Sequence, residues 1–113
     1  MSRSKQKGTA WESAIVHYLQ RLGVRAERRT LTGNKDRGDI AGIPGVVIEA
    51  KNTKAALLAQ YLDEANAERG HDGADIAVVW MKRVGHTSPA AGYVLMDGET
   101  FVGLLTDAGY IEE

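Results

Sequence analysis

The sequence predicts a single α/β domain in which helices flank a mixed central sheet. Two segments carry apolar residues at helical spacing, and shorter β-branched segments of strand length lie between and after them. A nearly continuous apolar segment at residues 75–81 is typical of a strand buried on both faces. The chain has 113 residues, about the length of one domain. The expected order is therefore helix, three strands, helix, two strands and a closing helix.

The first helix is predicted from Ala10 to Leu22. Thr9 is a favourable N-cap and Gly23 a favourable stop. Residues 1–7 are polar and basic with nothing to bury, so we expect a mobile N-terminal arm. One apolar stripe, expected in the core, is formed by Trp11, Ala14, Ile15, Tyr18, Leu19 and Leu22.

Three strands are predicted next. Residues 24–30 alternate imperfectly, which favours an edge strand, and residues 31–37 form a cationic loop. A short strand at 38–41, a turn at 42–45 and a β-branched strand at 46–51 form a hairpin.

The second half begins with a helix that Thr53 caps and that runs to about Glu68, with Gly70 as its stop. A loop at 82–91, a strand at 92–96 and a helix at 99–106 follow the apolar strand. The residues expected to face inward from the second helix are Leu57, Leu58, Tyr61, Leu62 and Ala65.

Composition narrows the chemistry. The chain lacks cysteine, so thiolate metal sites, disulfides and a Cys nucleophile are excluded. Its three histidines, His17, His71 and His86, are scattered, so we expect no histidine metal site. No apolar stretch suits a membrane span or a secretory signal. We therefore expect a cytoplasmic protein with no membrane partner.

Charge is distributed unevenly along the chain. Residues 1–37 hold nine Lys and Arg against three acidic residues, whereas residues 38–113 hold five basic and twelve acidic ones. This segregation favours a basic face for a polyanion, although two solvated surfaces would give the same pattern.

The most informative segment is the hairpin. If its turn is centred on Pro44, residues whose numbers sum to 88 face each other, so Asp39 lies opposite Glu49. Strand alternation puts Lys51 on the same face as Glu49. Opposed carboxylates need compensation, and a hard divalent cation such as Mg²⁺ or Mn²⁺ would supply it. A cross-strand salt-bridge cluster is the alternative interpretation.

These residues resemble the PD-(D/E)XK nuclease superfamily, and most closely its Holliday-junction-resolvase branch of small archaeal-type and phage-encoded enzymes. The branch's opening motif is similar to Lys7–Glu12 (KGTAWE), its acid-Ile-Ala segment to Asp39–Ala41, and its Ile-Glu-x-Lys-x-Thr segment to Ile48–Thr53. The resemblance runs from about residue 5 to residue 80. Gly38 stands where the superfamily's name leads one to expect proline.

The resemblance implies a restriction-endonuclease-like αβββαβ core and Mg²⁺-dependent phosphodiester hydrolysis, with Mn²⁺ as a substitute. Asp39, Glu49 and the backbone carbonyl of Ala50 would hold the metal, and Glu12 would complete the site or help hold a second ion. Lys51 would orient the attacking water or offset developing negative charge.

Three of these assignments have structural alternatives. Glu12 also completes a capping box with Thr9, and Gln60, a candidate donor behind the site, also suits an ordinary helix face. The loop at 32–37 is either a phosphate-binding segment or simply solvated. The expected contacts to the DNA backbone are Lys5, Lys7, Arg28, Arg29, Lys35 and Arg37.

We expect a structure-selective endodeoxyribonuclease of recombination and repair, acting on four-way DNA junctions in the bacterial or phage-infected cell, at the nucleoid. One small domain leaves no module for reading bases, and paired cuts in a two-fold junction suit a homodimer. Its interface candidates are the strand at 78–81, the strand at 93–96 and Phe101. The alternatives are another nuclease of the superfamily, acting on flaps or single strands or as a repair nickase, and a catalytically silent DNA-binding module.

Overall fold

The computed structural model describes residues 3–29, 38–54 and 57–112, without the side chains of residues 4 and 5. The predicted order of helices and strands is confirmed. The elements are α1 (Arg3–Arg21), β1 (Glu27–Arg28), β2 (Ile40–Ala41), β3 (Val46–Lys51), α2 (Leu58–Asp72), β4 (Ile76–Met81), the 3₁₀ turn η1 (Pro89–Ala91), β5 (Tyr93–Leu95) and α3 (Gly98–Asp107).

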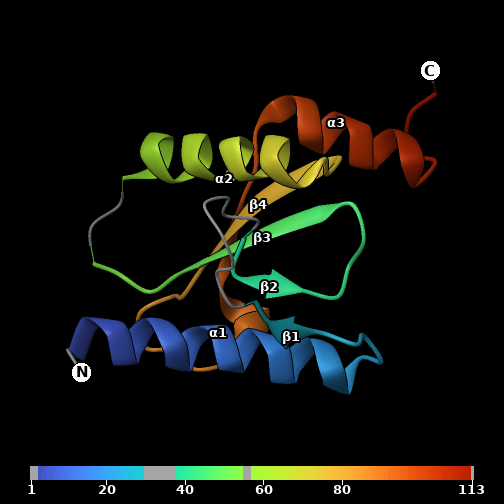
Figure 1. Cartoon of the computed structure of the whole chain (residues 1–113). Coiled ribbons are helices and arrows are strands. Elements are labelled where there is room, and N and C mark those ends of the chain that lie inside the picture. The colour runs from blue at the N-terminus through green and yellow to red at the C-terminus, as the bar shows by residue number, and fades with distance from the viewer. Residues whose placement is uncertain (1–2, 30–37, 55–56, 113) are drawn as a thin grey trace.

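The five strands form one mixed sheet in the order β1-β2-β3-β4-β5. Neighbouring strands pair antiparallel except for β3 and β4, which are parallel because α2 crosses over between them. In Figure 1, α1 covers one face of the sheet, and α2 and α3 lie on the other. The predicted mixed sheet flanked by helices is therefore confirmed.

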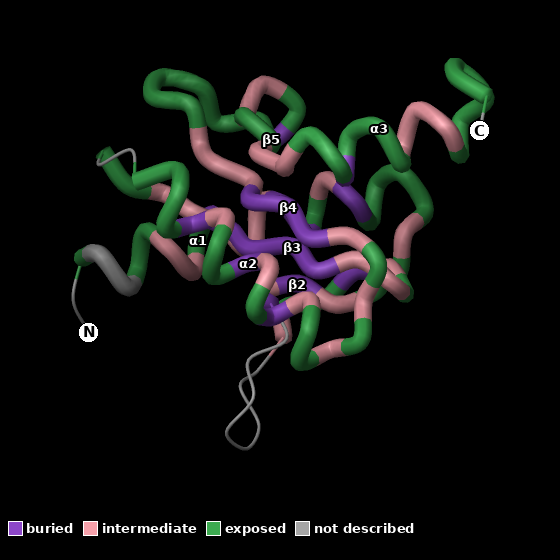
Figure 2. The backbone as a smooth tube through the Cα atoms, turned by 90° about the horizontal axis from the view of Figure 1, so that it is seen from above, coloured by how far each residue is buried: buried purple, intermediate pink, exposed green. Residues whose placement is uncertain are grey.

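Side-chain alternation on β3 divides the core into two layers. Ile48 and Ala50 belong to the cluster formed with α1, whereas Val47 packs with Tyr61 and Ala65 of α2. Strand β4 is buried on both faces, as predicted, and Figure 2 shows the buried backbone concentrated on β3 and β4. The sheet is therefore a rigid platform for the side chains at its ends.

The aromatic residues of α1 are core residues, as expected. Trp11 is 2% exposed and donates a hydrogen bond from Nε1 to the backbone oxygen of Trp80 at 2.9 Å. Tyr18 meets the Trp80 ring edge-on, with 6.0 Å between centroids. These contacts fix α1 against the end of β4.

The prediction for the start of the first helix is wrong. Helix α1 begins at Arg3, so residues 3–7 are helical rather than a separate arm, and Thr9 lies inside the helix. The apolar stripe begins only at Trp11, and an apolar pattern carries no signal for solvated turns that precede it. Leu22 falls outside the helix and is 64% exposed, so it does not extend the stripe.

The predicted bounds of the second helix are also wrong. Thr53 precedes helix α2 rather than capping it, and Gly70 lies within the helix, which ends at Gly73 in the left-handed conformation. An exposed glycine inside a helix costs only about 1 kcal/mol, so it does not stop one that is packed on a sheet. Of the residues expected inward, Tyr61 and Ala65 are buried and Leu62 is half-buried, but Leu57 and Leu58 are exposed.

The remaining elements match their predictions more closely. Strand β1 is an edge strand, as predicted, but spans only Glu27–Arg28. The predicted cationic loop at 31–37 lies outside the described residues. No helix within the described ranges is long and apolar enough to cross a membrane.

Candidate active site

The hairpin register places two carboxylates on neighbouring strands. Ile40 pairs with Ile48, which is the predicted register, and Asp39 lies one residue before β2 at the same end of the hairpin. The Asp39 backbone N–H donates to the oxygen of Ile48 at 3.0 Å. The Asp39 carboxylate accepts a hydrogen bond through Oδ2 from the N–H of Ala50, at 2.8 Å. The Asp39 side chain is therefore fixed at the peptide that joins Glu49 to Ala50.

Gly38 has a structural reason to be glycine. Its φ of +97° is closed to proline, whose ring holds φ near −65°. A Cβ at this position would also lie 3.0 Å from Cγ1 of Val47. Glycine rather than proline at this position therefore follows from the local backbone that leads into Asp39.

Glu49 is buried with an incomplete set of hydrogen bonds. The residue is 5% exposed, and its Oε1 atom has no hydrogen-bond partner among the described residues. A buried carboxylate oxygen without a donor is costly, and a cation is the partner that would compensate it best. The carboxylates of Asp39 and Glu49 and the backbone carbonyl of Ala50 are oxygen ligands, the type that Mg²⁺ and Mn²⁺ prefer.

Lys51 is held from the side of α2. Alternation along β3 puts it on the same face as Glu49. Its Nζ lies 3.6 Å from Oε2 of Glu64 and 5.1 Å from the centre of the Tyr61 ring. The Lys51 side chain is 29% exposed, so solvent reaches part of it.

Sequence reasoning missed Glu64. Gln60 is exposed and donates from Nε2 to Oε1 of Glu64 at 3.1 Å, while the other carboxylate oxygen holds Lys51. Gln60 is thus connected to Lys51 only through Glu64. The spacing of four residues between Gln60 and Glu64 on one helix face is the sequence signal that could have found it.

Glu12 approaches from the opposite layer. Its Oε1 lies 3.3 Å from Nε of Arg28. Burial raises the pKa of Glu12, the negative charge of Asp39 raises this pKa further, and Arg28 opposes both. The two carboxylates are therefore close enough to repel each other. The alternative capping box is excluded, because Thr9 lies inside α1.

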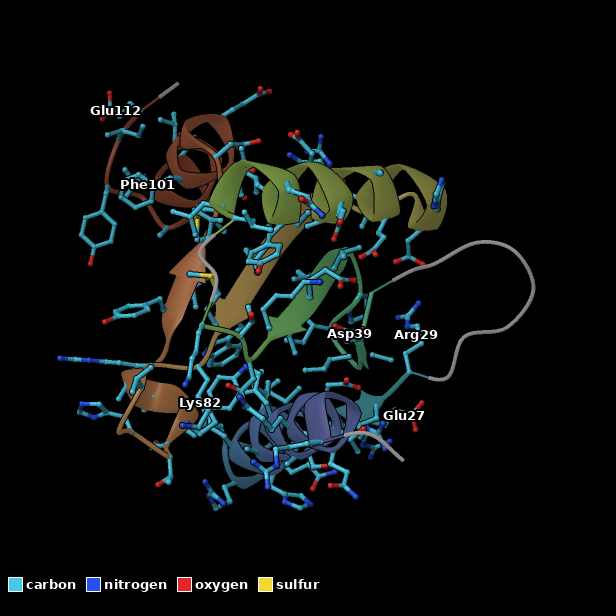
Figure 3. The ribbon with its side chains drawn as sticks, turned by 90° about the vertical axis from the view of Figure 1, so that its left-hand side faces the viewer. Glu27, Arg29, Asp39, Lys82, Phe101 and Glu112 are labelled. Atoms are coloured by element: carbon cyan, nitrogen blue, oxygen red, sulfur yellow. The ribbon has the colours of Figure 1, made fainter. Side chains whose placement is uncertain are left out.

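Glu12, Asp39 and Glu49 are not gathered into one metal-binding cluster. Within the described ranges, no three carboxylate or imidazole side chains are close enough together to hold a metal ion. The closest arrangement to the predicted site is the pair of Asp39 and Glu49 with the Ala50 backbone, and Glu12 stands beside Asp39. Figure 3 shows Asp39 between α1 and α2 at the level of the sheet.

The predicted DNA contacts have different surroundings. Arg28 pairs with Glu12, and Nη1 of Arg29 lies 3.4 Å from Oδ1 of Asp72, so both guanidinium groups are partly occupied. Lys7 is exposed on the first turns of α1. The Lys5 side chain, Lys35 and Arg37 lie outside the described residues.

Comparison of the chain with protein-family models, with curated proteins and with solved structures found no match.

Proposed function

We propose that this chain is a Mg²⁺-dependent endonuclease with a restriction-endonuclease-like core that resolves branched DNA, in the manner of Holliday junction resolvases. One observation carries the proposal: the Asp39 carboxylate is fixed at the Ala50 peptide, directly beside buried Glu49, whose Oε1 has no partner among the described residues. Lys51, two residues after Glu49, is the last residue of the same strand.

Each residue has a role that its position supports. Asp39, Glu49 and the carbonyl of Ala50 would hold Mg²⁺, for which Mn²⁺ substitutes. The bound ion would neutralise the phosphate and acidify a water molecule. Lys51 would orient that water or offset developing negative charge on the phosphate. Glu12 would complete the site or help hold a second ion, and Gln60 would act on Lys51 only through Glu64.

A homodimer would give two such sites for the two cuts that a four-way junction needs. Of the interface candidates, Val78 and Val79 are buried within the chain because β4 is an inner strand, so they cannot form the interface. Exposed apolar side chains on edge strand β5 and on α3 remain as candidates, as Figure 3 shows for Phe101. They are Val94, Phe101 and Val102.

The experiment that tests the proposal is a panel of DNA substrates incubated with and without Mg²⁺. A synthetic four-way junction, a flap, a linear duplex and a single strand are compared with wild type, Asp39→Asn, Glu49→Gln and the exposed control Glu27→Gln. We expect Mg²⁺-dependent cutting of the junction. Each site substitution should reduce the rate at least about 100-fold, because several kcal/mol of charge stabilisation are removed. Glu27→Gln should cut normally.

The same panel separates the alternatives. Preferential cutting of the flap, of the single strand or of one duplex strand would indicate another nuclease of the superfamily. A wild type that binds junctions but cuts nothing with Mg²⁺ or Mn²⁺ would be a silent DNA-binding module. Normal cutting by Asp39→Asn or Glu49→Gln would overturn the proposed site.

A further inference from the structure

A groove begins at Lys51 and runs across the ends of the neighbouring strands, on the side away from Asp39. Its volume is about 580 Å³, enough for one or two nucleotides, since sites for small organic ligands occupy roughly 300–1,000 Å³. The walls combine cations with apolar and aromatic surface. The residues that define this mixture are Lys54, Lys82, Arg83, Met81, Val84 and Tyr93.

The sheet register builds this groove. Lys51 pairs with Met81 and Met81 with Tyr93, so the three residues form one row across β3, β4 and β5 and project from the same face. The Lys82 N–H extends the pairing by donating to the oxygen of Lys51 at 3.0 Å. The groove is therefore continuous with the strand end that carries the proposed catalytic amine. Figure 3 shows Asp39 and Lys82 on the two sides of β3.

The cations of the groove are available to a ligand. Within the described part of the chain, no carboxylate forms an ion pair with Lys54, Lys82 or Arg83. A second hollow of about 330 Å³ shares Lys54 and Lys82 and continues to Lys7 of α1. The cationic surface thus extends beyond a single phosphate site, which favours a polyanion.

The apolar part of the groove favours a polyanion that also offers flat apolar surfaces, such as unpaired bases. Tyr93 is 52% exposed, and the Arg83 guanidinium lies 5.9 Å from the centre of its ring. Aromatic rings and guanidinium planes are the surfaces on which unpaired bases stack. A paired duplex presents phosphates but hides its base faces, so Tyr93 and the adjoining apolar wall would gain nothing from it.

We infer that this groove binds an unpaired nucleic-acid strand, with Lys54, Lys82 and Arg83 at its phosphates and a base stacked on Tyr93. The inference rests on the proposed function, because it describes how the same DNA leaves the metal site beside Lys51. A strand splayed open at a branch point would enter the groove, whereas an intact linear duplex would not. The groove would thereby supply the preference for branched over linear DNA.

The test measures binding without turnover. Fluorescein-labelled dT12 and a duplex of the same length are titrated in EDTA with the full chain, followed by fluorescence anisotropy. The variants are Lys82→Ala/Arg83→Ala, Tyr93→Ala and Tyr93→Phe. The matched controls are Arg21→Ala/Arg25→Ala, which removes two exposed cations from the other end of α1, and Tyr110→Ala, which removes a tyrosine that is 79% exposed.

We expect wild type to bind dT12 and Tyr93→Ala to weaken that binding by about 5- to 100-fold, the range for loss of one stacked base. Tyr93→Phe should bind normally, because phenylalanine keeps the ring. The groove double variant should bind dT12 more weakly than the control double variant, and its binding should depend less steeply on salt concentration. Duplex binding should change little in Tyr93→Ala.

Two results would overturn the inference: binding of dT12 by Tyr93→Ala as tightly as by wild type, or equal losses in the groove and control double variants. The outcome is independent of cleavage. If groove variants lose dT12 binding while wild type cuts no DNA, the proposed function fails and the groove stands. If wild type resolves junctions and the groove variants bind dT12 and cut junctions normally, only the groove is wrong.

Discussion

Glu49 is a carboxylate that the fold buries without a hydrogen-bond donor for Oε1 among the described residues. An unsatisfied buried polar group costs about 1–3 kcal/mol, and more when it is charged. A core selected for stability alone would hold an apolar residue at position 49. A buried carboxylate that lowers stability is therefore typical of a functional site. Asp39 and Glu12 add further negative charge in the same region, since the charge of Asp39 raises the pKa of Glu12.

The raised pKa of Glu12 predicts a pH-dependent stability. The folded chain holds the Glu12 proton at pH values where the unfolded chain, near the ordinary pKa of 4.5, has lost it. The free energy of unfolding therefore falls as pH rises from that ordinary value through the raised one, and the penalty stays constant above it. Glu12→Gln removes this titration, so its Tm relative to wild type should be higher at pH 7 than at pH 4.

The measurement is thermal unfolding in EDTA, followed by circular dichroism at both pH values, with Glu27→Gln on β1 as an exposed control. EDTA keeps divalent cations from masking the repulsion. If the Tm of Glu12→Gln exceeds that of wild type by more at pH 4 than at pH 7, the cause assigned to the raised pKa of Glu12 is wrong.

At the level of elements, the hairpin depends on a close backbone approach at Gly42. This residue has φ of +123°, and a Cβ there would collide with the Arg25 oxygen and lie 2.7 Å from Cα of Ala26. The chain entering β1 is therefore packed directly on the turn that follows β2. Only glycine permits this packing, which in turn fixes the strand that carries Asp39.

We predict that Gly42→Ala lowers the free energy of unfolding by about 1–3 kcal/mol, the usual range for overpacking. It should also reduce junction cutting, because β2 must shift. Gly70→Ala is the control: a Cβ there meets nothing within 4 Å, and Ala is the better helix former, so stability should rise by up to about 1 kcal/mol. Urea titration measures both. An unchanged midpoint for Gly42→Ala would refute the proposed close packing.

Elements with local signals were predictable. The β-branched run and the glycines of the turn gave β3 its bounds and the hairpin its register, in which Ile40 pairs with Ile48. Helix ends were less predictable. The first turns of α1 are solvated. Helix α2 begins at Leu58, after an N-cap residue that forms no side-chain cap, and its C-cap is Gly73 rather than Gly70. Packing against the sheet decided these bounds more than local propensity did.

Contacts between segments that are distant in the chain could not be predicted from the sequence. Glu64 reaches Lys51 from α2, and Arg28 reaches Glu12 from β1, but no local pattern specifies either pair. The groove is similar in this respect, since Lys51, Met81 and Tyr93 become neighbours only through the order of three strands. Topology therefore supplied the surroundings of a site whose central residues a hairpin pattern could predict.

For the whole molecule, the important feature is that one end of the sheet collects the proposed chemistry. Lys51 ends β3, the first turns of α1 with Lys7 lie at the same end, and the groove connects them through Lys82. In Figure 1 this end lies on the left, away from the C-terminal end of α1. A DNA strand that crosses the end of the sheet would therefore contact the proposed metal site, the amine of Lys51 and the groove in turn.

The central claim is that Asp39 and Glu49 together hold a divalent cation, and a calorimetric titration of the full chain with Mn²⁺ tests it most directly. Wild type should bind Mn²⁺ saturably, Asp39→Asn and Glu49→Gln should each lose this binding, and Glu27→Gln should retain it. Mn²⁺ binding by Glu49→Gln with wild-type affinity would contradict the claim.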